Sequence, residues 1–209
     1  MTADKIIELA RTQIGITEMP PNSNNVKYNT WYYGKPVSGS AYPWCCTFIE
    51  WLFKGTNLIK RTASCSDLLR WCQTNALIVD KPKMGDLVFF NFDNPKVLAQ
   101  HIGIVDKAKG IKDIYSIEGN TSEKGSQDNG GAVLRKHRTG KCIVAFARPK
   151  YSNAQGTLTN ITNHKSNEEI AKEVIQGKWG MANDRRQRLS NAGYNYQEIQ
   201  KLVNQILKG

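Results

Sequence analysis

The sequence places a cysteine, a histidine and two polar residues where a covalent catalyst would need them. Cys45 lies in the stretch "AYPWCCTFIEWLF", two residues after Pro43, a residue type that is common at the start of a helix. The unpaired N–H groups and the dipole at a helix start favour a thiolate, the nucleophilic form of cysteine. Such a nucleophile also needs a histidine within hydrogen-bond reach and a third group that orients the imidazole.

Of the three histidines, His101 is the best placed to act as the base. It opens the apolar run "HIGIV", and a histidine at the start of a strand has a rigid support and an exposed end. His137, in the basic segment "LRKHRTG", and His164, in a polar stretch, are expected at the surface. The run "DIYSIEGN" ends in Glu118 and Asn120, which would share one face of an extended strand, so either could orient the imidazole.

The cysteine doublet also allows other interpretations. In a helix, Cys46 points about 100° away from Cys45, so we expect it to be a small hydrophobic neighbour of the nucleophile. A metal or redox pair is a further hypothesis, which the absence of a C-x-x-C motif weakens. We expect the other cysteines, Cys65, Cys72 and Cys142, in the core. Five cysteines cannot all pair within the chain, and reduced cysteines fit a protein made in a cytoplasm.

The elements that must position these residues can be read from the periodicity of the first 150 residues. Residues 2–15 predict an amphipathic helix with Thr2 as its cap, and further helices are expected over residues 43–54 and in "CSDLLRWCQTN". Residues 20–40 are rich in Pro, Asn, Gly and Ser and predict a loop. After Pro82, strands are expected in "GDLVFFNF", "HIGIVDKA", "DIYSIEG", "AVLRKHR" and "CIVAFARP". Helices followed by antiparallel strands indicate an α+β domain.

The last third of the chain has a different composition. Residues 151–163 carry no charge and are mostly small and polar, which is typical of a linker. Beyond them, three segments show helical periodicity, with expected caps at Asn167, Asn183 and Asn195 and stops at Gly177 and Gly193. We therefore predict a domain over residues 1–150, a linker over residues 151–166 and a small three-helix bundle over residues 167–209.

Composition and charge restrict the class of protein. A hydrophobic content of 40% and a charged content of 22% suit a soluble globular protein, and no apolar run is long enough to span a bilayer. The net charge of +11 is spread along the chain, which favours an anionic polymer such as a bacterial wall but supports no specific nucleic-acid partner. The first twenty residues lack the apolar centre of a signal peptide.

Four short motifs together resemble the CHAP domain, a family of cysteine, histidine-dependent amidohydrolases and peptidases with a papain-like fold. These are "WCCTFIEW", "GDLVFF", "HIGIV" and "IEGN", in the order that the family shows. The resemblance covers roughly residues 3–150. It implies that Cys45 is the nucleophile, that His101 and Glu118 are the histidine and acidic residue, and that Asn120 is the family's asparagine. Cys46 takes a position that is ordinarily alanine-like.

The tail resembles the wall-binding repeat of a choline-independent pneumococcal phage lysozyme. That repeat often reads "GKWGNG" where this chain reads "GKWGMA". The resemblance implies binding to the muropeptide part of peptidoglycan, with Trp179, Asp184, Arg185 and Tyr194 as candidate contacts. Arginine can pair with carboxylates and aromatic rings can stack on sugars, although Trp179 and Tyr194 could equally pack the bundle.

These resemblances lead us to expect a phage endolysin, made in the host cytoplasm and acting on the cell wall after release. We favour an N-acetylmuramoyl-L-alanine amidase. A peptidoglycan cross-bridge or stem-peptide endopeptidase is the alternative, and a non-catalytic wall-binding protein is the further one. We expect no cofactor and no membrane insertion. We also expect no metal, because the stretch "PPNSNNVKYN", where some CHAP enzymes bind calcium, contains no carboxylate.

Overall fold

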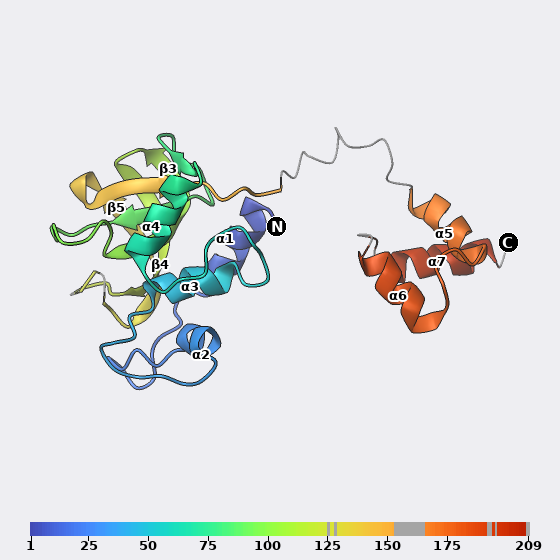
Figure 1. Ribbon diagram of the computed structural model, residues 1–209, viewed down its shortest axis with the longest axis horizontal. Coiled ribbons are helices and arrows are strands. Elements are labelled where there is room, and N and C mark those ends of the chain that lie inside the picture. The colour runs from blue at the N-terminus through green and yellow to red at the C-terminus, as the bar shows by residue number, and fades with distance from the viewer. Residues whose placement is uncertain (125, 128, 153–165, 192–193, 195, 208–209) are drawn as a thin grey trace. The chain divides into compact units, whose positions relative to one another are not determined.

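Antiparallel strands form the centre of the first of two units, Met1–Asn153 and Ala154–Gly209, into which the computed structural model divides the chain (Figure 1). The structure describes residues 1–207 except 125, 128, 153–165, 192, 193 and 195. Six described strands pair in the order β1-β6-β2-β3-β4-β5, and every neighbouring pair is antiparallel. Their bounds are β1 Ile78–Val79, β2 Leu87–Phe90, β3 His101–Gly110, β4 Asp113–Thr121, β5 Ala132–Thr139 and β6 Ile143–Ala147.

The helices of this unit form where apolar periodicity and caps predict them, with one exception. They are α1 Ala3–Arg11, α2 Lys27–Tyr33, α3 Cys45–Leu52 and α4 Cys65–Thr74, and a 3₁₀ turn spans Gly140–Cys142. Thr2 caps α1 by accepting a hydrogen bond from the Lys5 N–H, and Ser64 caps α4 in the same way with Asp67. The predicted helices and the α+β class are therefore confirmed, and β1 is an additional short strand.

The exception is α2, because the prediction of a loop over residues 20–40 was wrong. Lys27–Tyr33 is helical although its surroundings are rich in turn-forming residues. The ring of Tyr28 is fully buried, stacks 5.6 Å from Trp44 and meets Phe48 edge to face at 5.0 Å. These contacts with the next helix stabilise a turn of helix that local composition does not favour.

The strands alternate their side chains between two apolar clusters. Leu87 and Phe89 of β2 point into the main core with α1, α3 and α4, whereas Val88 and Phe90 pack in a second cluster on the other face. Helix α3 lies against β3 and β4, so its first residue is close to the strands that carry the polar site (Figure 1).

Two polar contacts fix the ends of this unit. The Met1 amino group donates to Ser152 Oγ at 3.0 Å, and the Ser152 N–H donates to the Met1 carbonyl at 3.1 Å. Asp86, in the "GDLVFF" motif, is buried and accepts two hydrogen bonds from Arg148, each at 2.8 Å. This motif thus connects β2 to the segment that follows β6 and takes no part in the polar site.

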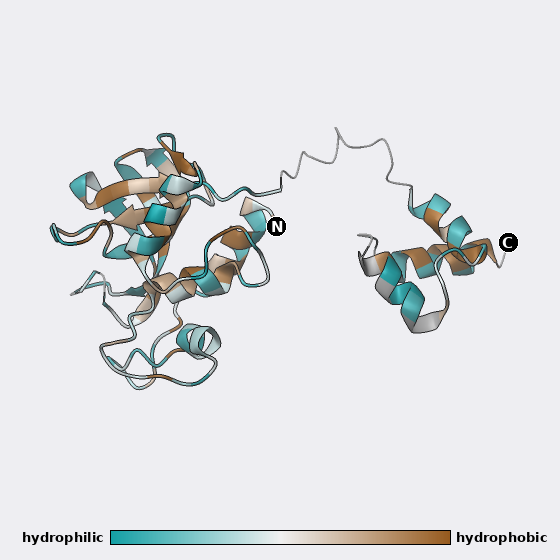
Figure 2. Cartoon of the chain, in the orientation of Figure 1, coloured by the Kyte–Doolittle hydropathy of each residue, from teal (hydrophilic) through white to brown (hydrophobic). Residues whose placement is uncertain are grey.

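The second unit is a bundle of three helices, α5 Asn167–Ile175, α6 Ala182–Asn191 and α7 Tyr196–Ile206. Its core consists of Ile170, Ala171, Val174, Leu189, Ile199 and Val203. Figure 2 shows α5 and α7 with mixed hydrophobic and hydrophilic residues, whereas α6 is largely hydrophilic. Among the described residues of the whole chain, no helix is long and apolar enough to cross a membrane.

Two of the expected caps of this bundle were wrong, and part of the prediction lies outside the described residues. The cap of α5 is Ser166, not Asn167, because Ser166 and Glu169 form a reciprocal capping box. Helix α6 begins at Ala182, so Asn183 lies inside the helix. Gly193, Asn195 and most of the predicted linker fall among the residues that the structure does not describe.

Candidate active site

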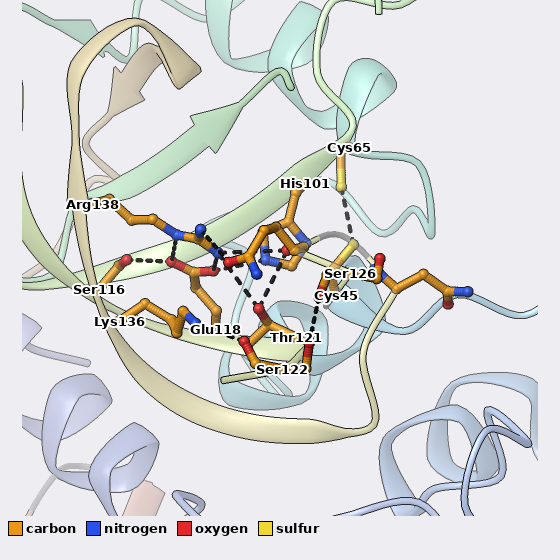
Figure 3. Close-up of polar contacts among 12 residues, drawn as sticks. Cys45, Cys65, His101, Ser116, Glu118, Thr121, Ser122, Ser126, Lys136 and Arg138 are labelled. Atoms are coloured by element: carbon orange, nitrogen blue, oxygen red, sulfur yellow. Dashed lines mark hydrogen bonds and ion pairs between the residues drawn. The ribbon is translucent and has the colours of Figure 1, made fainter. Parts of the chain in front are cut away.

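Cys45 is the first residue of α3, and Figure 3 shows its sulfur in contact with Cys65, close to His101 and a group of polar side chains from neighbouring strands. Only 4% of the residue is exposed. The preceding residue, Trp44, is fully buried and donates from its indole nitrogen to Glu18 Oε1 at 3.0 Å, which fixes the entry into the helix. The thiol therefore occupies the helix-start position that the sequence predicts.

His101 and Glu118 form a buried pair between β3 and β4. Nε2 of His101 lies 3.0 Å from Oε2 of Glu118, and both side chains are inaccessible to solvent. Nδ1 of His101 is buried and has no hydrogen-bond partner within the described part of the chain. Because Nε2 is paired with the carboxylate, Nδ1 is the nitrogen that remains available to accept a proton from a thiol.

Glu118 is held from three sides (Figure 3). Besides His101, its carboxylate accepts a hydrogen bond from Ser116 Oγ at 2.5 Å and from Arg138 Nε at 2.9 Å, and Nη2 of Arg138 contacts the second oxygen. Burial raises the pKa of Glu118, but the hydrogen bonds from Arg138 and His101 outweigh it and hold the pKa at about 2. Glu118 is consequently an anion at any pH at which the protein would work.

The pKa values of Cys45 and His101 are linked. Burial lowers the pKa of His101, but the neighbouring Cys45 thiol and Glu118 carboxylate outweigh burial and raise it to about 9. Hydrogen bonding to Cys65 and burial raise the pKa of the Cys45 thiol, whereas His101 acts in the opposite direction. The imidazole is thus a strong base with a carboxylate behind it, as proton abstraction from a buried thiol requires.

Two glycines allow the elements of the site to approach each other. A Cβ on Gly103 would lie 2.7 Å from Glu118 Cγ, so a side chain there would displace the carboxylate. A Cβ on Gly119 would lie 2.7 Å from Phe48 Cβ and 2.8 Å from Trp44 Cζ3, which is where α3 packs on β4. The "HIGIV" and "IEGN" motifs therefore contain glycine for reasons of close packing.

Asn120, the fourth predicted site residue, lies at an irregularity of β4. It is fully buried, has a positive φ of 59°, and stands where the pairing of β4 with β5 shifts in register between Glu118 and Thr121. Its Nδ2 lies 3.4 Å from Asn129 Oδ1, and its carbonyl accepts from the Gly130 N–H at 2.7 Å. These contacts connect Asn120 to the segment that follows β4.

Sequence reasoning missed three residues that surround the catalytic candidates. Arg138 seemed to be part of a basic strand end, yet it is buried and pairs with Glu118 across β4 and β5. Ser116 was passed over, although it lies two residues before Glu118 on the same face of β4, a spacing that could have found it. Cys65 was expected in the core, and it is buried, but its sulfur also lies 3.4 Å from that of Cys45.

Of the remaining cysteines, Cys46 also interacts with the Cys65 thiol, and the others lie farther along α4 or nearer the surface. Cys46 is fully buried and its thiol donates to the Thr62 carbonyl at 3.2 Å, while Cys72 is fully buried farther along α4. The prediction of a core position for Cys142 was wrong, because this residue is only partly buried. His137 is exposed and pairs with Asp113, and His164 falls outside the described residues. Within the described residues, no three His, Cys, Asp or Glu side chains are grouped to hold a metal.

The four candidate wall contacts all lie on the bundle, but two are packed aromatic rings and two are polar side chains. Trp179 donates to Glu173 at 3.0 Å and packs edge to face on Tyr194 at 5.8 Å, and both rings contact the bundle core. Asp184 is exposed and pairs with Arg188, whereas Nε of Arg185 donates to the Gly180 carbonyl at 3.1 Å. The packing role of the two aromatic residues is therefore visible in the structure.

Comparison with known proteins assigns these features to two families. Residues 37–120 match the CHAP domain, and residues 168–207 match the CW_7 repeat, so the chain carries both. The first match contains Cys45, His101, Glu118 and Asn120 but ends before Arg138. The chain is also similar to the lysozyme of Streptococcus phage Cp-7, with 43% identity over 54 residues, 26% of this chain. That match spans 14% of the length of the phage lysozyme.

Proposed function

We propose that this protein is a peptidoglycan hydrolase of the endolysin type, in which Cys45 attacks an amide carbonyl of the bacterial wall. The observation that carries the proposal is the buried His101–Glu118 pair beside a cysteine at a helix start, within a CHAP domain. The CW_7 repeat and the similarity to a phage lysozyme support a target in the cell wall. The net charge of +11 would favour approach to an anionic wall polymer.

In this proposal the thiol proton of Cys45 passes to Nδ1 of His101 before attack, so a Cys45 thiolate beside a His101 imidazolium attacks the carbonyl carbon. Glu118 holds the imidazole in this orientation and stabilises its charged form, as a triad carboxylate does. The imidazolium then gives its proton to the leaving amine, and water hydrolyses the resulting thioester. The raised pKa of His101 would help it to take up the proton, and the lowered pKa of Glu118 would keep the supporting carboxylate charged.

The oxyanion that forms during attack would be stabilised at the start of α3. The first N–H groups of a helix have no partner within the helix, so the Cys45 N–H is available to a carbonyl oxygen that lies beside the sulfur. We assign Asn120 a supporting role at the same site, either in polarising the substrate or in holding the segment next to His101.

N-acetylmuramoyl-L-alanine amidase is the activity that we favour, with a cross-bridge or stem-peptide endopeptidase as the alternative. Both reactions use the same catalytic residues, so mass spectrometry of the fragments released from a defined wall decides between them. Free lactyl groups on muramic acid would identify the amidase. Newly exposed peptide amines would identify the endopeptidase and reject the amidase.

A non-catalytic wall-binding protein is the function from a different class. The experiment that separates it from the hydrolase compares wall lysis by the purified protein with lysis by Cys45→Ala. Loss of lysis with retained wall binding supports the hydrolase. Equal lysis by both proteins, or none by either, would reject Cys45 catalysis.

We further propose that residues 1–150 are the catalytic domain, residues 151–166 a linker and residues 167–209 the wall-binding repeat. Asp184 and Arg185 are the polar candidates for contact with a muropeptide, whereas Trp179 and Tyr194 contribute at most the exposed edges of packed rings. The protein would act on the wall after release from the host cytoplasm. No specific nucleic-acid partner is proposed.

A further inference from the structure

A second thiol touches the candidate nucleophile. Sγ of Cys65 lies 3.4 Å from Sγ of Cys45, and the two residues are the first residues of α4 and α3 (Figure 3). The proposed hydrolysis uses only Cys45, so the contact has no part in the steps described above. A role in core packing does not explain why a second thiol contacts the sulfur of the candidate nucleophile.

The distance between the two sulfurs is short enough for a covalent bond to form with little movement. A disulfide has an S–S length of about 2.05 Å, so the sulfurs would need to approach by roughly 1.4 Å. Because each cysteine starts its helix, a small displacement of one helix end could supply this movement without unfolding either helix.

Exposure distinguishes this pair from the other buried cysteines. Cys45 and Cys65 are 4% and 7% exposed, whereas Cys46 and Cys72 are fully buried. The two residues of the pair thus keep a trace of exposure that the other two lack. Cys45 also lies beside His101, which lowers the pKa of the thiol against the raising effects of Cys65 and of burial.

We propose that Cys45 and Cys65 form an oxidation site at which hydrogen peroxide converts the nucleophile reversibly into a disulfide. The Cys45 thiolate attacks one peroxide oxygen, the O–O bond breaks, and the leaving hydroxide takes the proton of the His101 imidazolium to become water. Cys45 is thereby oxidised to a sulfenic acid while the peroxide is reduced. The Cys65 sulfur then attacks the Cys45 sulfur, the S–O bond breaks, and hydroxide leaves with the Cys65 proton as a second water.

This site has two consequences for the protein. The disulfide removes the nucleophile, so hydrolysis stops until a thiol reductant restores Cys45. The disulfide also protects Cys45, because a sulfenic acid that has been captured by Cys65 cannot be oxidised further to the irreversible sulfinic and sulfonic acids. The first consequence rests on the proposed function, whereas formation of the bond does not.

The test treats the full-length protein with stoichiometric hydrogen peroxide and maps its disulfides by mass spectrometry under non-reducing conditions. We expect a single bond between Cys45 and Cys65, a loss of wall lysis in proportion to that bond, and full recovery with dithiothreitol. A bond between Cys46 and Cys65, or a protein whose thiols remain free while Cys45 is over-oxidised, would overturn the proposal.

The matched variants are Cys65→Ala and Cys72→Ala, which lie on the same helix, each compared with its own untreated activity. After a second treatment with excess hydrogen peroxide, which supplies the two equivalents that a sulfinic acid needs, Cys65→Ala should retain a sulfinic acid on Cys45 and fail to recover with dithiothreitol. Cys72→Ala should behave like the unaltered protein. Recovery of Cys65→Ala would reject the proposal. A protein that forms the bond yet never lyses walls would instead reject the proposed function and leave the oxidation site standing.

Discussion

Arg138 of β5 holds Glu118 of β4 through both carboxylate oxygens, at a site where neither side chain is accessible to more than a trace of solvent. The guanidinium is in turn fixed by Gln127, whose side-chain oxygen accepts from Nη1 at 2.8 Å. Arg138 is thus a positioning residue that acts on His101 through Glu118. Its hydrogen bonds also lower the pKa of Glu118, so the carboxylate stays charged while it is oriented.

Replacing Arg138 with Met should therefore lower kcat on the order of 10²-fold with little change in KM, because Glu118 is no longer fixed. The acidic limb of the pH–rate profile should move to higher pH, because the pKa of Glu118 rises when the hydrogen bonds from Arg138 are lost, and loss of structure alone would not produce this shift. Arg138→Lys should restore part of kcat. Arg135→Met, on the same strand but paired with Asp106, is the control and should leave the acidic limb in place.

The two adjacent cysteines should respond differently to replacement by alanine. Cys45→Ala should reduce wall lysis by at least roughly 10⁴-fold, because the nucleophile is lost. Cys46→Ala should keep most of the activity, since its thiol donates to the Thr62 carbonyl and interacts with Cys65 within the core. Turbidity loss of a wall suspension measures both. The opposite pattern would mean that α3 presents Cys46, not Cys45, to His101.

Lysis should decline as the pH rises through about 9, because the His101 imidazolium then loses the proton that it gives to the leaving amine. The free energy of unfolding should also decrease as the pH rises. The pKa of His101 is higher in the folded state than its ordinary value of 6.5, so its stabilising contribution is complete below pH 6.5 and is lost as the pH rises through 9. Initial rates and urea denaturation across pH 6–10 would measure the two effects.

Glu118→Gln is the variant that tests this assignment. It removes the carboxylate that supports the imidazolium, so the alkaline limb of the residual activity should move to lower pH. The variant should also be less stable by about 3–5 kcal/mol, because the Arg138 cation is left buried without a partner. An alkaline limb that stays where it is would remove His101 from the proposed proton transfer.

Gly103→Ala should reduce activity by roughly 10²-fold or more, because the new methyl group would occupy the position of the Glu118 side chain. Gly110→Ala is the matched control, since Gly110 ends the same strand and a Cβ there meets nothing within 4 Å. Far-UV circular dichroism should be alike for the two variants while their kcat values differ. Equal activities would contradict a catalytic need for the present position of Glu118.

Trp179→Ala should destabilise the bundle by about 2–3 kcal/mol, less than for a fully buried tryptophan. The loss should appear as an unfolding of the second unit alone in calorimetry. Asp184→Ala, which removes only an exposed pair with Arg188, should leave the melting temperature within experimental error. If Trp179→Ala weakens wall binding without a change in melting, its ring contacts the wall more than it packs the bundle.

Much of the fold could be predicted because short segments of the sequence indicate most of its helices and strands. The apolar spacing of α1 and α3 and the β-branched and aromatic runs of β2, β3 and β4 are properties of short windows. Helix α2 could not be found in this way, because Tyr28 is buried by Trp44 and Phe48, which come later in the chain. The cap of α5 was misplaced by one residue, within the usual uncertainty of a helix boundary.

Only those residues of the candidate site that lie in short sequence motifs could be predicted. Cys45, His101 and Glu118 each lie in a short motif, and the structure places the last two in direct contact. Arg138 and Cys65 lie twenty residues from the partner that gives them a role. Their contacts depend on strand register and on the packing of α4 beside α3, which no local pattern encodes. Whether these residues act as proposed is a matter for the variants described above.

The contact between Met1 and Ser152 brings the two ends of the first unit side by side. A short peptide could therefore join these ends, and new termini could be opened elsewhere, for example after Gly110, where the chain turns between β3 and β4 with open space around the backbone. This first unit could thus be grafted as an insert into a loop of another protein, with both of its attachment points at one place on its surface.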